Sequence, residues 1–230
     1  MTSRTSLTAG NLLAVDTSGS RGTLALGRIE SGRLADVEQT AWDKKAIHSE
    51  IATVKLQDLL AKAGLSLTDL SHIAVNVGPG SFTGIRVGIN LARTLAYACG
   101  IPIVGICALD LLAAKNSKVG DSTFVAIKAI QDFFYCASFQ LTSLGLDQRL
   151  APSSHGRTEL DSLAANSTKV LIEGQTPGFT PVTEAQDLLT HVFAFPDQSR
   201  FLSWKEVHPI YIRASEAEEK LLKGLLKREF

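Results

Sequence analysis

The sequence feature that most constrains the fold is a pair of apolar runs that occurs twice. Residues 11–15 form an apolar run that ends at Asp16, and a second run returns over residues 23–26. Two short apolar runs separated by turn residues predict a β-hairpin. The same arrangement recurs at residues 123–130 and 134–141. The chain is therefore expected to hold two related α/β lobes.

Helices and further strands are expected after each hairpin, from the spacing of apolar residues and the glycines that end the runs. The expected helices cover residues 48–63, 81–99, 108–114, 159–164, 185–193 and 214–227. The other expected strands cover residues 33–40, 72–77, 103–107 and 169–172. Residues 151–168 read as a polar segment. We expect a first lobe at 11–107, a second lobe at 108–213, and a C-terminal helix within 214–230 that the pattern assigns to neither lobe.

Composition excludes several classes of protein. Lys and Arg number 23 and Asp and Glu number 23, so the chain has no net charge with which to gather a polyanion unaided. The three cysteines are widely spaced with no Cys-x-x-Cys, which predicts a reducing compartment rather than a disulfide framework. The polar start lacks the apolar core of a secretory signal, and no run approaches the roughly 18 apolar residues of a membrane span. A cytoplasmic protein without a membrane partner is expected.

A glycine-rich loop, Gly78–Gly84, separates an expected strand from an expected helix. Its hydroxyls can cap the helix, and free N–H groups at a helix start can bind an anion. The loop is not a P-loop, because no Lys follows its last glycine. Two interpretations remain open, a phosphate cradle and an ordinary strand-to-helix turn.

A second polar group, Asp16-Thr17-Ser18, ends the first strand. A carboxylate with two hydroxyls could hold a phosphate through Mg²⁺, although the same residues commonly form turns. The candidate nucleotide-binding residues are Asp16, Thr17, Ser18, Gly80, Ser81 and Gly174.

Small residues recur at every fourth position of the expected helix 81–99, namely Gly84, Gly88, Ala92 and Ala96. Residues four apart share a helix face, so another backbone can approach this strip closely. The strip could pack on the chain's own sheet or on a partner. The preceding helix is also apolar on more than one side, which favours a helical interface to a partner. The expected interface residues are Ile51, Val54, Gly84, Val87, Gly88, Leu91, Ala92 and Leu95.

Catalytic and metal-binding patterns are not found. The histidines are scattered at positions 48, 72, 155, 191 and 208. Zinc and iron sites need clustered His, Cys or carboxylate ligands, and no nucleophile-and-base pair has a recognisable spacing. No catalytic residue and no metal ligand is therefore assigned.

Long stretches of the sequence resemble the TsaB (YeaZ) family of bacterial threonylcarbamoyladenosine biosynthesis proteins. The resemblance runs from about residue 11 to residue 213. Its motifs are LLAVDTS at 12–18, His48-Ser49-Glu50, GPGSFTGIRVGINLARTLAYACGIPIVGI at 78–106, and Pro209-Ile210-Tyr211-Ile212-Arg213, which is similar to the family's Pro-x-Tyr-Leu-Arg.

The resemblance implies a duplicated two-lobe fold similar to actin, sugar kinases and Hsp70, the ribonuclease H-like ASKHA class. It also implies a role as a structural and activating subunit. Such proteins pair through first-lobe helices with their catalytic paralogue, the transferase TsaD. With the ATPase TsaE, the complex modifies the adenosine beside the tRNA anticodon. Contact with tRNA would then come only through the complex, and a homodimer through the same helices is expected when the partner is absent.

Two departures from related sequences bear on chemistry. The catalytic paralogue carries a metal-binding His-x-x-x-His where this chain has Ala108 and Leu112, which cannot donate to a metal. Many family members read Ile-Asp-Ala-Arg where this chain has Ile127-Lys128-Ala129-Ile130, so a carboxylate of the inter-lobe cleft is lost. A non-catalytic subunit without a cofactor is expected, with ATP or ADP and Mg²⁺ at the complex as an open alternative.

Two other functions stay open. One is a nucleotide-dependent transferase or kinase that uses Asp16 and the Gly78–Gly84 loop by itself. The other, disfavoured by the missing histidine pair, is a metallopeptidase.

Overall fold

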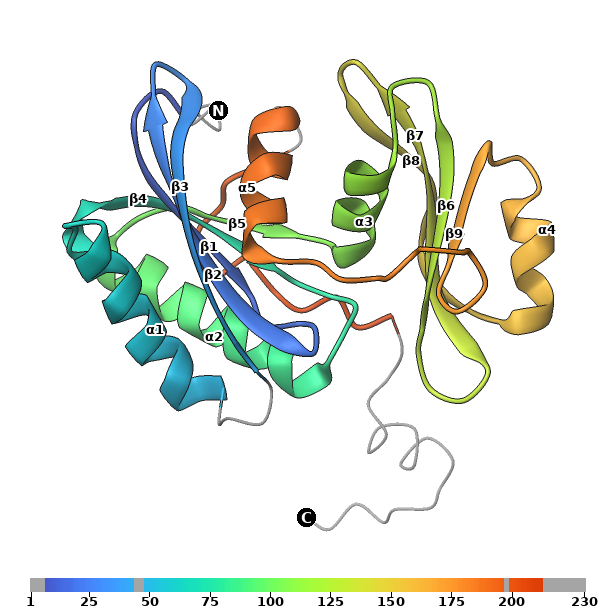
Figure 1. Ribbon diagram of the computed structural model, residues 1–230, viewed down its shortest axis with the longest axis horizontal. Coiled ribbons are helices and arrows are strands. Elements are labelled where there is room, and N and C mark those ends of the chain that lie inside the picture. The colour runs from blue at the N-terminus through green and yellow to red at the C-terminus, as the bar shows by residue number, and fades with distance from the viewer. Residues whose placement is uncertain (1–6, 44–47, 197–198, 213–230) are drawn as a thin grey trace, which may run out of the picture.

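Two β-sheets stand side by side in this protein, each with helices on both faces (Figure 1). The computed structural model describes residues 7–43, 48–196 and 199–212. The expected C-terminal helix at 214–227, the motif residue Arg213, and the side chains of His48, Ser49 and Glu50 lie outside the described residues.

The first sheet has five strands in the order β3-β2-β1-β4-β5. They are β1 (Gly10–Asp16), β2 (Arg21–Glu30), β3 (Arg33–Asp43), β4 (Leu70–Asn76) and β5 (Ile103–Ile106). The first three strands form an antiparallel meander, and β4 and β5 then continue the sheet parallel to β1. The carboxyl ends of β1 and β4 therefore meet at one edge of the sheet.

The second sheet repeats this plan with four strands in the order β8-β7-β6-β9. They are β6 (Ser122–Lys128), β7 (Phe133–Thr142), β8 (Gly145–Gly156) and β9 (Lys169–Ile172). Again three strands pair antiparallel and the fourth, β9, runs parallel to the first, β6. The prediction of a duplicated α/β architecture is confirmed.

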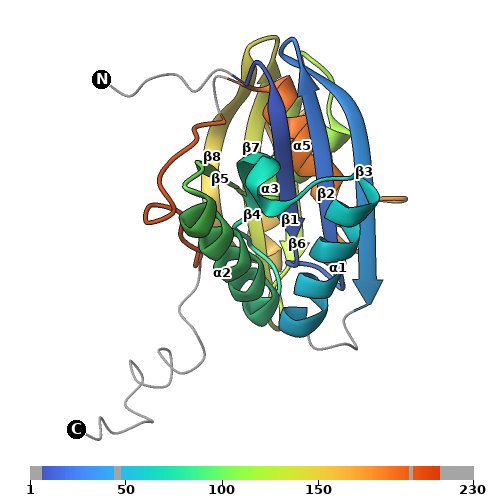
Figure 2. The ribbon, with the colours of Figure 1, turned by 90° about the vertical axis from the view of Figure 1, so that its left-hand side faces the viewer.

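Helices cover both faces of the first sheet. Figure 2 shows α1 (His48–Lys62) and α2 (Phe82–Cys99) together on one face, with α5 (Ala185–Ala194) behind the strands. Alternate residues of a strand point to opposite faces, so β1 feeds both cores: Leu13 packs under α1 and α2, and Leu12 packs under α5. The sheet is thus buried on both sides.

The second sheet is covered less completely. On one face lies α3 (Ala108–Asn116), which packs on Val125 and Phe139, and on the other lies the five-residue α4 (Leu160–Ala164) over Phe124. Two short 3-10 helices, Leu67–Asp69 and Arg157–Glu159, precede β4 and α4. No helix of the described residues is long and apolar enough to span a membrane.

The strand β8 is the main element that the sequence failed to predict. The sequence pattern assigns no element to its first half, and residues 151–156 read as part of a polar segment. It contains Pro152 and two serines, and it lies at the edge of its sheet, where a proline costs no ladder hydrogen bond. The strand β3 is also longer than the predicted 33–40.

The helix α5 follows the second sheet in the sequence but packs on the first. Ala185, Leu188 and Val192 lie in one apolar cluster with Leu12 and Ala74 of the first sheet. Residues 199–212 also return to this sheet, where the Leu202 and Ile103 backbones exchange hydrogen bonds of 2.8 and 3.0 Å. The division into lobes at residues 107 and 108 remains a proposal.

Candidate functional site

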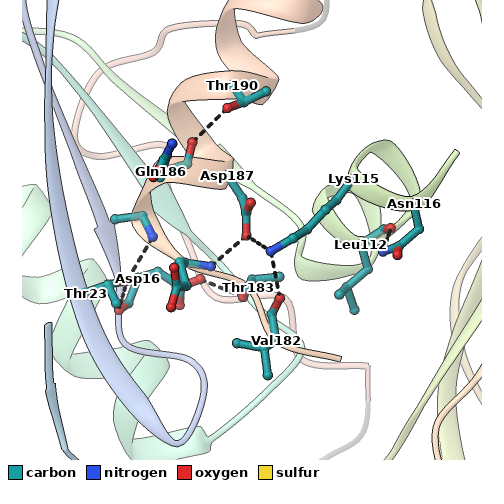
Figure 3. Close-up of polar contacts among 12 residues, drawn as sticks. Asp16, Thr23, Leu112, Lys115, Asn116, Val182, Thr183, Gln186, Asp187 and Thr190 are labelled. Carbon is teal, nitrogen blue, oxygen red and sulfur yellow. Dashed lines mark hydrogen bonds and ion pairs between the residues drawn. The ribbon is translucent and has the colours of Figure 1, made fainter. Parts of the chain in front are cut away.

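The carboxylate of Asp16 ends β1 and is 1% exposed. Its Oδ1 accepts hydrogen bonds from the Ser18 backbone N–H at 2.9 Å and from the Ser18 hydroxyl at 2.7 Å. Its Oδ2 accepts from the Asn76 amide at 2.9 Å and from the Thr183 hydroxyl at 2.6 Å. Figure 3 shows Asp16 beside Thr183, in the segment that leads into α5.

The parallel pairing of β1 with β4 explains this arrangement. Asn76 is the last residue of β4, so its side chain comes level with Asp16 at the same sheet edge. The Asn76 side-chain Oδ1 in turn accepts from the Gly78 backbone N–H at 2.9 Å, which fixes the start of the glycine-rich loop. Thr183 precedes α5 and brings this helix to the same point.

The Asp16 carboxylate has no free acceptor position of the kind a cation needs. Two oxygens offer about four lone-pair sites, and four donors of the chain occupy them. Burial raises the pKa of Asp16, while the hydrogen bonds from Thr183, Asn76 and Ser18 act in the opposite direction. The observed role of Asp16 is to join β1, β4 and the α5 segment, and its part in nucleotide binding remains a proposal.

The glycine-rich loop packs directly on this group. The Ser81 N–H donates to the Ser18 carbonyl at 2.7 Å, and the Ser81 hydroxyl caps α2 by accepting from the Gly84 N–H at 3.3 Å. A Cβ at Gly80 would lie 2.7 Å from the Ser18 carbonyl oxygen, so only glycine fits there. The structure thus brings five of the six candidate nucleotide-binding residues together.

The sixth candidate, Gly174, lies in the other lobe. It follows β9 and has a φ of 76°, and a Cβ there would lie 3.2 Å from the Lys128 ammonium nitrogen. Lys128 ends β6 as Asp16 ends β1. The second lobe therefore presents an ammonium group at the strand end where the first lobe has a carboxylate.

The small-residue strip of α2 corrects part of the interface prediction. A Cβ at Gly84 would lie 2.0 Å from the Thr17 carbonyl oxygen, and one at Gly88 would lie 2.4 Å from the Thr17 hydroxyl oxygen. The same hydroxyl donates to the Gly84 carbonyl at 2.7 Å. Ala92 and Leu95 are buried against the first sheet. These four residues pack within this chain, because the backbone that approaches the strip is its own.

The outer side of α1 and α2 remains available. Val54 is 54% exposed, and Ile51, Val87 and Leu91 are half-buried. At the two ends of α2, Phe82 and Tyr97 are 43% and 68% exposed. We call the apolar surface formed by Ile51, Val54, Val87 and Leu91 the α1–α2 face.

A ring and guanidinium cluster at the start of α2 was not predicted. The Arg86 guanidinium lies 4.0 Å from the Phe82 ring centroid, and its Nε donates to the Tyr211 hydroxyl at 2.9 Å. These contacts hold Tyr211 against the first turns of α2. The spacing of Phe82 and Arg86 by four residues was visible in the sequence, but their pairing with residue 211 depends on the tertiary fold.

The two positions where the resemblance implies metal-binding histidines in the paralogue lie in α3. Ala108 and Leu112 are 3% and 1% exposed. Nearby, burial raises the pKa of Asp110 to about 6, and one of its carboxylate oxygens has no partner among the described residues. Across residues 7–43, 48–196 and 199–212, no group of three His, Cys, Asp or Glu side chains could hold a metal ion.

Comparisons with known proteins agree with the fold. A family model described as TsaD, tRNA N6-adenosine threonylcarbamoyltransferase, matches residues 44–167, more than half of the chain. A YeaZ structure from Pseudomonas aeruginosa superposes with a TM-score of 0.66 at 22% identity, over 88% of this chain and 99% of that one. A second Pseudomonas aeruginosa structure, described as similar to peptidase YEAZ, has a TM-score of 0.70 at 22% identity, over 89% and 100%. The expected actin-like α/β fold is confirmed.

Curated relatives carry the same family name. The tRNA threonylcarbamoyladenosine biosynthesis protein TsaB of Bacillus subtilis is 29% identical over 232 residues, which cover 93% of this chain and 98% of that protein. The TsaB protein of Escherichia coli is 36% identical over 101 residues, covering 43% of this chain and only 44% of that protein. The chain therefore belongs to the family that the TsaD model describes and, within it, to the TsaB (YeaZ) group.

Proposed function

We propose that this chain takes part in threonylcarbamoyladenosine synthesis on tRNA as a non-catalytic subunit, which binds and supports a TsaD-type transferase. The proposal rests on the family, whose curated relatives are named for this pathway. One observation in this chain favours support over catalysis. Ala108 and Leu112 occupy the positions of the paralogue's metal ligands, and neither side chain can hold a metal.

The proposed docking site is the α1–α2 face. The two helices lie next to each other and expose apolar side chains such as Val54, while their inner sides are already buried in the first core. A helical interface of standard size buries roughly 1,600 Å² in total, and two helices of this length can supply one side of it. We also propose that a second copy of this chain uses the face when the transferase is absent.

Further partners belong to the same proposal. A TsaE-type ATPase would join the complex, and tRNA would reach this chain only through it. The proposed compartment is the cytoplasm, where the three free cysteines, Cys99, Cys107 and Cys136, stay reduced.

The experiment measures tRNA modification by the transferase, the ATPase and the adenylate-forming enzyme, with and without this chain. Size exclusion of the same samples reports complex formation. Val54→Asp places a charge on the α1–α2 face and is expected to weaken the complex at least about tenfold, with proportionate loss of modification. Val119→Asp, at a valine that is 68% exposed in the turn before β6, is the matched control and should leave both unchanged.

Two outcomes would contradict the proposal. One is transfer of the threonylcarbamoyl group by this chain alone. The other is an equal loss of binding in Val54→Asp and Val119→Asp, which would remove the α1–α2 face from the interface.

A further inference from the structure

A pocket of about 410 Å³ opens on the outer face of the second sheet, away from Asp16 and from the α1–α2 face. Its floor is formed by β6, β7 and β8, and its wall by α4 and the turn that follows α4; Figure 1 shows α4 on the side of this sheet opposite α3. The lining residues are Ser122, Ser138, Gln140, Arg149, Leu150, Leu163, Asn166 and Ser167.

The face of the second sheet that carries α4 is apolar under the helix and polar at the floor of the pocket. Along β6 the residues on this face are Ala126, Phe124 and then Ser122, and along β7 they are Cys136 and then Ser138 and Gln140. The apolar half is covered by α4, which has only five residues and ends before it can cover the rest. Hydroxyl and amide groups therefore occupy floor positions that a longer helix would have required to be apolar.

A β-bulge brings the charged side chain into the pocket. Ser138 pairs with Leu150, and the next residue, Phe139, pairs with Gln148, so Arg149 is an extra residue in β8. Adjacent residues of a regular strand point to opposite faces, yet Arg149 and Leu150 both line the pocket. Bulges redirect side chains in this way and are frequent beside binding sites.

Some polar groups of this pocket are already used within the chain: the Ser122 hydroxyl donates to the Asn166 carbonyl at 3.3 Å, and the Gln140 amide donates to the Gly120 and Asp121 carbonyls. Others have no partner among the described residues. Neither the Arg149 guanidinium nor the hydroxyls of Ser138 and Ser167 form a hydrogen bond or ion pair with any described residue. Arg149 is the one charged residue among those that line the pocket. An unpaired guanidinium among hydroxyls and amides, with no lining carboxylate, favours a ligand that is an anion rich in acceptors.

We infer that this pocket binds a phosphate monoester group. The Arg149 fork can hold two phosphate oxygens, and the Ser138 and Ser167 hydroxyls with the Asn166 amide supply donors for the remainder, more than a two-oxygen carboxylate would use. The volume lies in the range of small-molecule sites, and Leu150 and Leu163 give an apolar wall for the organic part of the ester. The inference does not depend on the proposed function, since no residue of the α1–α2 face is involved.

The experiment follows backbone amide NMR signals of the full chain during titration with ribose 5-phosphate. Saturable shifts are expected at Ser122, Ser138, Gln140 and Ser167. Arg149→Gln is expected to weaken binding at least about tenfold, because the charge-assisted pair is lost. Arg33→Gln, at an exposed arginine of β3 in the other lobe, is the matched control and should bind as the wild type does.

A second variant separates a loss of binding from a loss of folding. Ser138→Ala removes a hydroxyl from the floor at nearly constant volume and should also weaken binding, while the spectrum shows that the fold persists. A parallel titration with tRNA, with and without its 5′-phosphate, separates the two sources of a monoester. Shifts at the pocket with phosphorylated tRNA alone would assign the group to RNA.

The inference is overturned if neither probe shifts these amides saturably. It is also overturned if the shifts persist undiminished in Arg149→Gln, or if they map to other residues.

Discussion

The first sheet lies between two long helices and α5, whereas the second lies between α3 and a helix of only five residues. Both sheets have the same strand arrangement, three antiparallel strands followed by parallel addition. The repeated arrangement therefore fixes where strands run, and the covering helices decide which faces stay open. The open face of the first lobe is helical and apolar, and that of the second is a polar part of the sheet itself.

The corresponding strand ends differ in the same way. In the first lobe, Asp16 is buried and accepts four hydrogen bonds. In the second, Lys128 is exposed, and its backbone N–H donates to the Glu173 carboxylate at 2.6 Å. The two lobes thus share a strand arrangement but not the chemistry of the strand end, because one side chain is a buried acceptor and the other an exposed cation.

The largest effect is expected where α2 packs on the end of β1. In Gly84→Val the new Cβ would lie 2.0 Å from the Thr17 carbonyl oxygen, far inside van der Waals contact, so the backbone must shift. We expect the free energy of unfolding in urea to fall by about 4 kcal/mol. Gly19→Val is the control, since the nearest atom to its Cβ lies 4.0 Å away. An unchanged stability with weaker partner binding would instead return the strip to the interface.

A direct comparison of the two strand ends should give the next largest effect. Asp16→Ala leaves the buried donors of Ser18, Asn76 and Thr183 without their acceptor, and is expected to cost about 3 kcal/mol of unfolding free energy. Lys128→Ala removes an exposed side chain and should change stability by less than about 0.5 kcal/mol. Equal losses in urea unfolding would show that the two ends are structurally equivalent after all.

Local pattern was sufficient to predict the fold and part of the site. The helix at residues 82–99, capped by Ser81 and ended by Gly100 with a φ of 66°, follows from apolar spacing and two end residues. Asp16 and the glycine-rich loop were singled out, and the parallel strand pattern would have added Asn76. These are properties of neighbours in sequence or of adjacent parallel strands.

What the sequence could not predict depends on contacts between distant segments. The recurrence of small residues on α2 has the same form whether Thr17 or a partner approaches, so spacing alone could not assign Gly84 and Gly88. Thr183 reaches Asp16 from 167 positions away, because α5 returns to the first sheet. Arg149 points into a pocket only because of a bulge, which the alternation of strand residues does not predict.

A pH-dependent effect is expected from His191, which α5 holds in the core with both ring nitrogens unpartnered among the described residues. Burial lowers its pKa from 6.5 to about 4. Between these values the unfolded chain binds a proton that the folded protein does not, so stability is lost as pH falls through this window. The wild type should therefore lose about 2 kcal/mol of unfolding free energy between pH 8 and pH 5 that His191→Leu does not lose.

The comparison must be made between variant and wild type at each pH. The pKa of Asp110 is raised to about 6, so that carboxyl favours the folded state as pH falls, opposite to His191, and it contributes equally to both proteins. His208→Leu, at an exposed histidine, is the control and should parallel the wild type. A constant difference between His191→Leu and wild type across the range would mean that His191 binds its proton equally readily in the folded and the unfolded chain.

The smallest effect is expected at an ion pair between α3, which covers the second sheet, and α5, which covers the first. The Lys115 ammonium on α3 lies 3.0 Å from the Asp187 carboxylate on α5, and Figure 3 shows the two side chains meeting beside Val182. The lysine side chain is 45% exposed, so Lys115→Met should cost only about 0.5 kcal/mol in urea unfolding. Arg28→Met breaks a pair whose two members are 58% and 59% exposed, and it serves as the control with no measurable change.

The reason for so small a loss is that apolar packing also joins α3 to α5 at this point. Leu111 of α3 lies in the same buried cluster as Leu188 of α5, and this contact persists in Lys115→Met. A single unfolding transition should therefore be kept. If the variant instead unfolds in two transitions, the ion pair rather than Leu111 couples the unfolding of the two sheets. The apolar contact between α3 and α5 would then contribute less to this coupling than its burial implies.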